Sequence, residues 1–401
     1  MAHGRRRFRR SRLDRRVKRV RRRGRPLMST ASGPWILLGF WVALIASAVL
    51  AVVFLVIPMF TEITENEPAP TMMPSERPAD SPAAHDIQTT ELGALQKEIS
   101  PGVRYVGATC SFDGVLAYSG GVDENGDPLL KNIFLVDLSD PENPGQLPVT
   151  AERQDIFSLD MNDAWLVFTD GSRAGGGLIK AFNRKTGEVV AVKEYYAGQP
   201  VLSLSGDFLA WTERTGTYMD KLYLCDLNTL EYVTVATFEG SRYGQSKPSA
   251  RNGQLIWAEA DPSAPQDGPA KSVIRYVDLD GGTGQIGTYQ ANTYVHDPVT
   301  NGRDWAWIDA DHGAGARLYL SLNGSEPLLI ADEVLTYGIT DTFLAYNRRN
   351  SIYVYFLSDG YEQIVTPASE SAMLANVSSD KVIWFETGIL SRDVLKYAAI
   401  S

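Results

Sequence analysis

One stretch decides the fold: Gly206–Glu231, which reads GDFLAWTERTGTYMDKLYLCDLNTLE. It begins with a Gly-Asp turn, continues with a short apolar run that ends at Trp211, and then passes through a polar loop. A second apolar run follows from Lys221 to Asp226, before a turn at Leu227–Leu230. Short apolar runs separated by turn residues are typical of antiparallel strands, and no helical period interrupts them.

The same unit recurs along the chain. Its aromatic residues are Tyr118, Phe168, Trp211, Trp257, Trp307, Tyr346 and Trp384, spaced 50, 43, 46, 50, 39 and 38 residues apart. Four antiparallel strands in a repeat of about 40–50 residues are the signature of a propeller blade. We therefore predict an all-β, seven-bladed β-propeller, with six blades as the alternative, in which the aromatic side chains pack between blades.

The two ends of the repeat region are expected to close the ring together. The chain stops at Ser401, directly after the third strand of the last repeat. The segment 92–99 (LGALQKEI) is predicted to supply the missing outer strand. Cys110 and Cys225 fall on blades that are not neighbours, too far apart for a disulfide, so both are expected to be buried thiols.

The third repeat resembles the TolB-like propellers of bacterial envelope proteins, a WD-repeat-like group. The pattern that carries the resemblance is Gly-Asp-x-Leu-Ala-Trp followed by Lys-Leu-Tyr-x-x-Asp-Leu-x-Thr. The resemblance covers residues 92–401 and is clearest in the third repeat. TolB itself is soluble, periplasmic and six-bladed, so its own partners do not carry over to this chain. The resemblance implies non-enzymatic binding or scaffolding as the commonest role.

The N-terminal part predicts a membrane anchor. Residues 1–26 hold 14 Lys and Arg against the single acid Asp14, whereas the whole chain has a net charge of -10. Residues 35–57 form an uncharged apolar run of 23 residues, long enough for a membrane-spanning helix. A cleaved signal peptide is the alternative, but its apolar region is usually shorter.

These segments give a domain plan. Residues 1–34 are a basic cytoplasmic tail that lies on anionic lipid, 35–57 the transmembrane signal anchor, 58–91 a Pro-rich linker and 92–401 the propeller. The positive-inside rule keeps the N-terminus in the cytoplasm and places the propeller outside the plasma membrane. Because the remainder of the chain is strongly acidic, nucleic acid is not expected as a partner.

The sequence contains no recognisable catalytic motif. Residues 123–127 and 309–313 resemble calcium loops but lack the closing Glu, so turn chemistry explains them and neither a metal nor a cofactor is expected. His296-Asp297 could act as a general base. No matching nucleophile accompanies this pair, which favours a polar strand beside a wet channel and gives no catalytic residue.

Loops on one face of the ring are the expected binding surface, for an envelope protein or a glycan. The exposed-type candidates there are Arg173, Glu213, Arg214, Tyr218, Arg242, Tyr243, His312 and Arg348.

The sequence therefore favours a non-enzymatic, single-pass membrane protein that displays a binding propeller at the cell envelope. The alternative is a surface hydrolase or lyase that acts on carbohydrate or peptide through acidic residues near the axis. Paired carboxylates about 5–10 Å apart in a deep axial pocket would favour the enzyme, as would a strongly raised pKa on one of them, whereas a shallow loop face without such a pair would favour the binder. A third possibility is a sensor whose basic tail meets a cytoplasmic partner.

Overall fold

The computed structural model describes residues 88–91, 107–122, 128–140, 145–152, 155–172, 175–217, 219–239, 246–261, 272–279, 285–291, 293–309, 316–366, 371–387 and 393–400. The chain divides into two units, residues 1–80 and 81–401, and every described residue belongs to the second. The predicted anchor 35–57 lies outside the described residues. Within the described ranges, no helix has the length and apolar character needed to cross a membrane.

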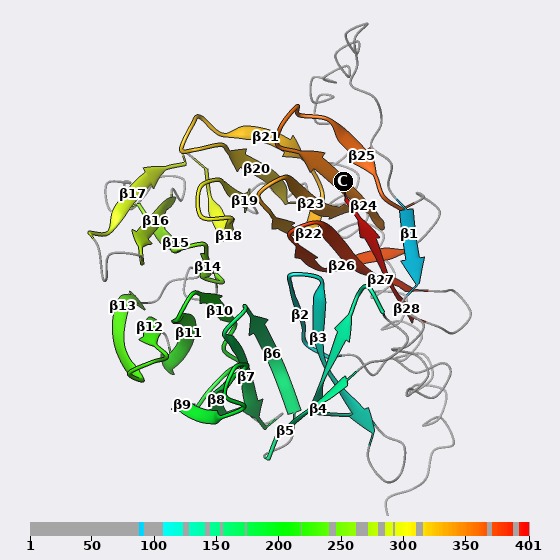
Figure 1. The fold of residues 1–401 in the computed structure, drawn as a ribbon. Helices are drawn as coiled ribbons and strands as arrows, with labels where there is room; N and C mark the ends of the chain where they lie inside the picture. Colours follow the sequence, from blue (N-terminus) through cyan, green and yellow to red (C-terminus); the bar gives the residue numbers. More distant parts are fainter. Residues whose placement is uncertain are drawn as a thin grey trace, which may run out of the picture. The chain divides into compact units, whose positions relative to one another are not determined.

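The second unit is an all-β propeller of seven four-stranded antiparallel sheets, as predicted (Figure 1). Blade 1 consists of β2 (Thr109–Phe112), β3 (Val115–Val122), β4 (Pro128–Asp137) and β5 (Gly145–Thr150). Blade 2 consists of β6 (Asp155–Met161), β7 (Trp165–Gly171), β8 (Gly177–Asn183) and β9 (Val189–Tyr195). Blade 3 consists of β10 (Leu202–Ser205), β11 (Phe208–Gly216), β12 (Met219–Asp226) and β13 (Glu231–Glu239).

The other four blades follow the same plan. Blade 4 consists of β14 (Ser249–Arg251), β15 (Gln254–Ala260), β16 (Ser272–Asp278) and β17 (Gly287–Gln290). Blade 5 consists of β18 (Val295–Thr300), β19 (Trp305–Asp309), β20 (Arg317–Ser321) and β21 (Leu328–Ala331). Blade 6 consists of β22 (Val334–Ile339), β23 (Phe343–Arg348), β24 (Ser351–Phe356) and β25 (Glu362–Ile364). Blade 7 consists of β26 (Ala372–Ser378), β27 (Lys381–Thr387), β28 (Asp393–Ala399) and β1 (Gln88–Glu91).

Blade 7 joins the two ends of the domain. Its outer strand β1 pairs antiparallel with β28, in a register that sets Gln88 opposite Ala399 and Glu91 opposite Lys396. A strand exchange was predicted, but the predicted segment 92–99 was wrong. The closing strand lies just before it, in residues assigned to the linker, because the polar sequence QTTE pairs through its backbone and needs no apolar pattern to do so.

Left-handed turn residues explain the short first hairpins of blades 1 and 4. Asp113-Gly114 connects β2 to β3 with φ angles of 44° and 75°, and Asn252-Gly253 connects β14 to β15 with 46° and 78°. Two successive positive φ angles match the twist of a hairpin, and Asn, Asp and Gly tolerate them best. In these two blades the Asp/Asn-Gly turns of the sequence repeat therefore mark the points where the inner strand reverses.

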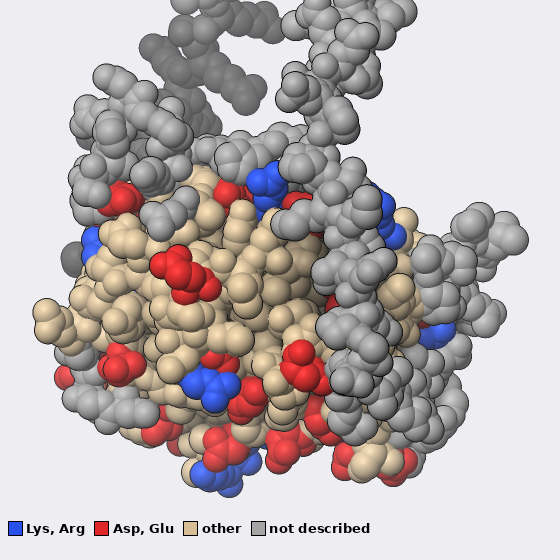
Figure 2. Space-filling view, turned by 90° about the horizontal axis from the view of Figure 1, so that it is seen from above, with Lys and Arg blue, Asp and Glu red and all other residues tan. Residues whose placement is uncertain are grey.

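The core lies between neighbouring blades, as predicted for the repeated aromatic residues. Trp211, Trp307, Trp384, Tyr346 and Phe168 are all fully buried. One cluster joins blades 3, 4 and 5, and another joins blades 2 and 3, so each sheet covers its neighbour. On the face in Figure 2, acidic side chains outnumber basic ones among the described residues and are scattered over the surface.

Candidate functional site

The inner strands of all seven blades surround an axial cavity of about 350 Å³, to which β2, β6, β10, β14, β18, β22 and β26 each contribute side chains. A smaller cavity of about 120 Å³ lies at the ends of the inner strands and shares Arg251 and Val377 with the first. Arg251 therefore lies where the two cavities meet.

His296 and Asp297 form a strained pair in the inner strand of blade 5. The strand β18 is bulged between His296 and Val299, and Asp297 has a φ of 46°. Nδ1 of His296 lies 3.3 Å from Oδ2 of Asp297, which lines the axial cavity. A non-glycine residue with positive φ inside a strand is uncommon, and such strain concentrates at functional sites.

Both neighbouring blades hold this pair in place. The Lys247 N–H donates to Oδ1 of Asp297 at 2.7 Å, and the Asp297 N–H donates to Oγ of Ser246 at 2.8 Å. From blade 6, the Tyr337 hydroxyl donates to the Asp297 carbonyl, and it lies 3.2 Å from the His296 carbonyl. The strained backbone is therefore fixed from blades 4 and 6.

Burial alone would raise the pKa of the Asp297 carboxyl. The hydrogen bond and charge of His296, together with the Lys247 N–H, outweigh burial and lower this pKa below its usual range. The carboxylate is therefore ionised at neutral pH and orients the imidazole through Nδ1.

A second polar cluster in the same cavity joins blades 2, 3 and 4. Oδ1 of Asp160 lies 3.8 Å from the Arg251 guanidinium, and its two oxygens accept the N–H groups of Met161 and Leu204 at 2.8 and 2.7 Å. Burial raises the pKa of Asp160, and Arg251 and the two N–H groups offset only part of that effect. The cavity thus contains two carboxyls whose pKa values move in opposite directions.

Of the eight predicted site residues, the structure describes Glu213, Arg214 and Arg348. The other predicted site residues, Arg173, Tyr218, Arg242, Tyr243 and His312, lie outside the described residues, as do the calcium-like residues 123–127 and 310–313. Arg348 ends β23 on blade 6, away from the other two. Its Nε is buried and has no hydrogen-bond partner among the described residues.

Glu213 and Arg214 lie together in β11 rather than in an exposed loop. The prediction of exposure was wrong for Glu213, which is 4% exposed. The reason is an ion pair with Lys193 of the neighbouring blade, at 2.7 Å, which makes burial of the carboxylate tolerable. Arg214 is half-exposed and lies 3.3 Å from Asp220.

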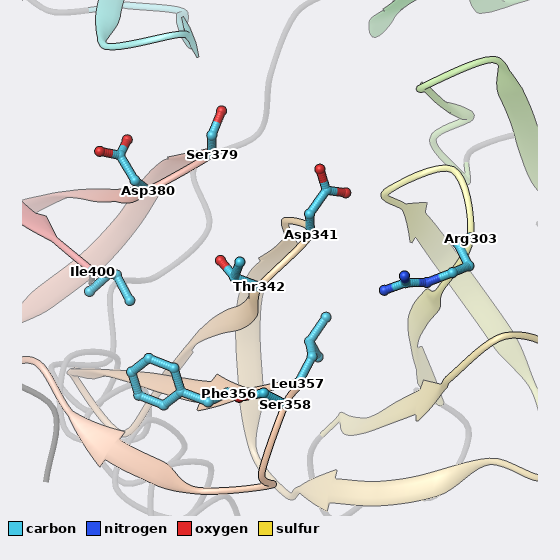
Figure 3. Close-up of a pocket in the computed structure, with 9 residues that line it drawn as sticks. All are labelled: Arg303, Asp341, Thr342, Phe356, Leu357, Ser358, Ser379, Asp380 and Ile400. Carbon is cyan, nitrogen blue, oxygen red and sulfur yellow. The ribbon is translucent and has the colours of Figure 1, made fainter.

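A cavity of about 490 Å³ lies between blades 5, 6 and 7 (Figure 3). Its lining comes from the turns that leave the inner and third strands, at the opposite end of the propeller from the links that enter the inner strands. Figure 3 shows Asp341 and Asp380 on two of these turns and the Arg303 guanidinium on a third. Because Arg303 is bound to Asp304 at 2.7 Å, its charge is largely satisfied within the protein.

Neither a metal cluster nor a reactive thiol emerges from the described part of the chain. No group of three or more His, Cys, Asp or Glu residues there could hold a metal ion. Cys110 and Cys225 are free and buried, as predicted, and burial raises the pKa of Cys225 to about 11.

Solved propellers of enzymes resemble this chain in fold. The β-propeller domain of the trilobed protease from Pyrococcus furiosus matches with a TM-score of 0.56 at 12% identity, over 73% of this chain and 94% of that one. The acylaminoacyl peptidase of Pyrococcus horikoshii matches with 0.53 at 12% identity, over 73% of this chain but only 50% of that one. An oligogalacturonate lyase in complex with manganese matches with 0.50 at 14% identity, over 80% and 94%.

These matches establish the propeller fold. No protein-family model and no curated protein sequence matches the chain. The expectation of a non-enzymatic protein was wrong, because the similar structures are a lyase and the propellers of peptidases, which point to enzyme-related proteins. The resemblance to TolB-like propellers rests on a repeat signature, which reports how blades pack and carries no information about chemistry at the axis.

Proposed function

We propose that this protein is an extracytoplasmic, membrane-anchored enzyme that cleaves an acidic carbohydrate chain in its axial cavity. The observation that carries this proposal is the His296–Asp297 pair, a strained and oriented imidazole–carboxylate unit whose carboxylate lines a cavity formed by all seven blades. Such a pair is suited to accept a proton. Perturbed carboxyls in a cavity of this kind favour the enzyme over a simple binding surface.

The charges of the cavity suit an anionic sugar. Lys247 and Arg251 line the cavity from blade 4, at the two ends of its inner strand. A cation beside a uronate carboxylate stabilises the negative charge that develops when the neighbouring carbon loses its proton. We therefore assign Lys247 and Arg251 to the recognition of the substrate carboxylate.

In this proposal Asp297 holds Nδ1 of His296, which leaves Nε2 to accept a proton. The proton moves from the carbon next to the uronate carboxylate to the imidazole. The electron pair of the broken C–H bond forms a carbon–carbon double bond, the glycosidic C–O bond breaks, and the leaving oxygen takes a proton from water. The same pair could instead activate water for hydrolysis.

The similar structures support a carbohydrate more directly than a peptide. The match spans 94% of the oligogalacturonate lyase, so in that enzyme a propeller of this size makes up nearly the whole chain. In the acylaminoacyl peptidase the match spans only half of the chain.

The test is cleavage of a panel of polymers by the full chain. Polyuronates, neutral polysaccharides and unstructured peptides are incubated with it, and reducing ends, new amines and ultraviolet absorption of a conjugated double bond are measured. The proposal predicts reducing ends from polyuronates only. Ultraviolet absorption identifies elimination, and its absence identifies hydrolysis. Cleavage of peptides alone, or of no polymer, would overturn it.

The cellular placement belongs to the same proposal and rests on the sequence. We propose that residues 35–57 anchor a TolB-like propeller outside the plasma membrane, with the basic tail inside. Protease added to intact spheroplasts should then remove the propeller and leave a small protected N-terminal fragment. A propeller that resists protease until the membrane is lysed would contradict this placement.

A further inference from the structure

A cavity of about 250 Å³ lies between blades 2 and 3, beside the axial one. One wall is the link from β9 to β10, residues 197–201, in which Gly198 turns the chain with a φ of 74°. The other wall is the hairpin of β11 and β12, with Thr212, Glu213, Arg214 and Asp220. The site is therefore formed by regular strands and a tight link.

The polar groups of this cavity are fixed before any ligand arrives. Glu213 and Asp220 are 4% and 7% exposed, and each has a cationic partner: Lys193 at 2.7 Å and Arg214 at 3.3 Å. The ammonium of Lys193 also lies over the ring of Tyr223, 4.9 Å from its centroid. Because these carboxylates are already held in place, they can accept hydrogen bonds from ligand hydroxyls without a further loss of side-chain entropy on binding.

The cavity adjoins the axial one, because Val201 lines both. The link 197–201 leads into an inner strand in the same way as Lys247-Pro248 leads into β14, so both cavities open toward the same end of the propeller. Tyr196, which directly precedes this link, is 77% exposed and presents an aromatic ring of the kind that stacks on sugars.

We propose that this cavity is a subsite that binds a sugar unit next to the one cleaved in the axial cavity. This inference rests on the proposed function and deepens it. Glu213 and Asp220 accept hydrogen bonds from sugar hydroxyls, and Arg214 donates to a uronate carboxylate or a ring oxygen. Because the cavity suits a single sugar ring, the subsite favours long chains over fragments that fill only the axial cavity.

The test compares Arg214→Ala with Arg317→Ala in the full chain. Arg317 is a matched control on blade 5, because its Nε also lies 3.3 Å from an aspartate, Asp332, and it is similarly exposed. With a long polyuronate, Arg214→Ala should raise KM about tenfold and leave kcat unchanged, whereas Arg317→Ala should change neither. With the shortest fragment that is still cleaved, both variants should match the wild type.

Gln199→Ala, in the link rather than the hairpin, gives a second variant that leaves both ion pairs intact and should raise KM for long chains alone. Unchanged KM in Arg214→Ala and Gln199→Ala would overturn the subsite while cleavage by the wild type upholds the axial site. Binding is measured separately by electrophoresis through polyuronate gels. Equal retardation of the wild type and both variants would overturn the subsite, even if the axial site proved inactive.

Discussion

At the scale of single residues, two fully buried indoles occupy equivalent positions but differ in their hydrogen bonds. Trp211 in blade 3 has an Nε1–H without a partner among the described residues, whereas Nε1 of Trp307 in blade 5 donates to Oγ1 of Thr293 at 3.0 Å. Replacing either indole by the smaller phenyl ring of Phe removes a similar volume from the core. Only Trp307→Phe also leaves a hydroxyl without its donor.

We therefore expect Trp307→Phe to lower the free energy of unfolding by about 1 kcal/mol more than Trp211→Phe. Urea denaturation of the two variants measures the difference. A larger loss in Trp211→Phe would show that shape, and not the hydrogen bond, dominates at these positions.

The two carboxyls of the axial cavity predict opposite pH dependences. Asp297 has a lowered pKa in the folded state, so its ionised form stabilises the fold above about pH 4, and this contribution disappears as the pH falls through the folded-state value. Asp160 has a raised pKa, so its ionised form is less favourable in the folded protein than in the unfolded chain.

Asp297→Asn should therefore destabilise most at pH 7 and progressively less below pH 4. Asp160→Asn should be tolerated better at pH 7 than at low pH. Thermal unfolding of both variants and the wild type, measured from pH 7 to below pH 4, tests both expectations. Parallel curves for the two variants would contradict the assignment of opposite pKa shifts.

The sequence indicates these residues only in part. It singled out His296-Asp297, but treated the pair as a polar strand because no nucleophile accompanies it. The bulge and the left-handed Asp297 come from contacts with Ser246, Lys247 and Tyr337 of neighbouring blades, which no local pattern encodes. Asp160 gave no signal at all, since its raised pKa comes from burial in the assembled ring.

At the scale of elements, the repeat made the blades predictable. A feature of that repeat which sequence reasoning missed is an acid two residues after the aromatic. The pairs are Phe168/Asp170, Trp211/Glu213, Trp257/Glu259, Trp307/Asp309 and Trp384/Glu386. Four of these acids form ion pairs with a Lys or Arg of another strand. In blade 6 the equivalent position, two residues after Tyr346, is Arg348. This position points toward the neighbouring strands in the other blades, so the side chain of Arg348 is partly buried although it was predicted to be ligand-binding surface.

The closing strand β1 makes a second prediction for an element. A fragment that starts at residue 81 keeps β1, whereas one that starts at residue 92 leaves β28 as an open edge. We expect the shorter fragment to unfold at a lower temperature and to aggregate at concentrations where the longer one stays monomeric. Calorimetry and light scattering measure both. Equal melting temperatures would show that the exchange contributes little to the ring.

At the scale of the whole molecule, the fold could be predicted from the sequence repeat, whereas the functional site could not. Seven repeats in one chain sufficed for the ring, because each blade buries its faces only against neighbours. The axial cavity is formed by residues from all seven blades, from Cys110 to Val377, so it exists only once the ring has closed. Its polar clusters join blades 4, 5 and 6 at Asp297 and blades 2, 3 and 4 at Asp160.

The most direct test of the account is the turnover number of Asp297→Asn on a polyuronate that the wild type cleaves. The control is Asp163→Asn, a surface aspartate 3.8 Å from Lys185 with a side chain 69% exposed. We predict that Asp297→Asn lowers kcat about 100-fold or more while the protein remains folded at pH 7, and that Asp163→Asn leaves kcat unchanged. A folded Asp297→Asn variant with the kcat of the wild type would contradict an active site in the axial cavity.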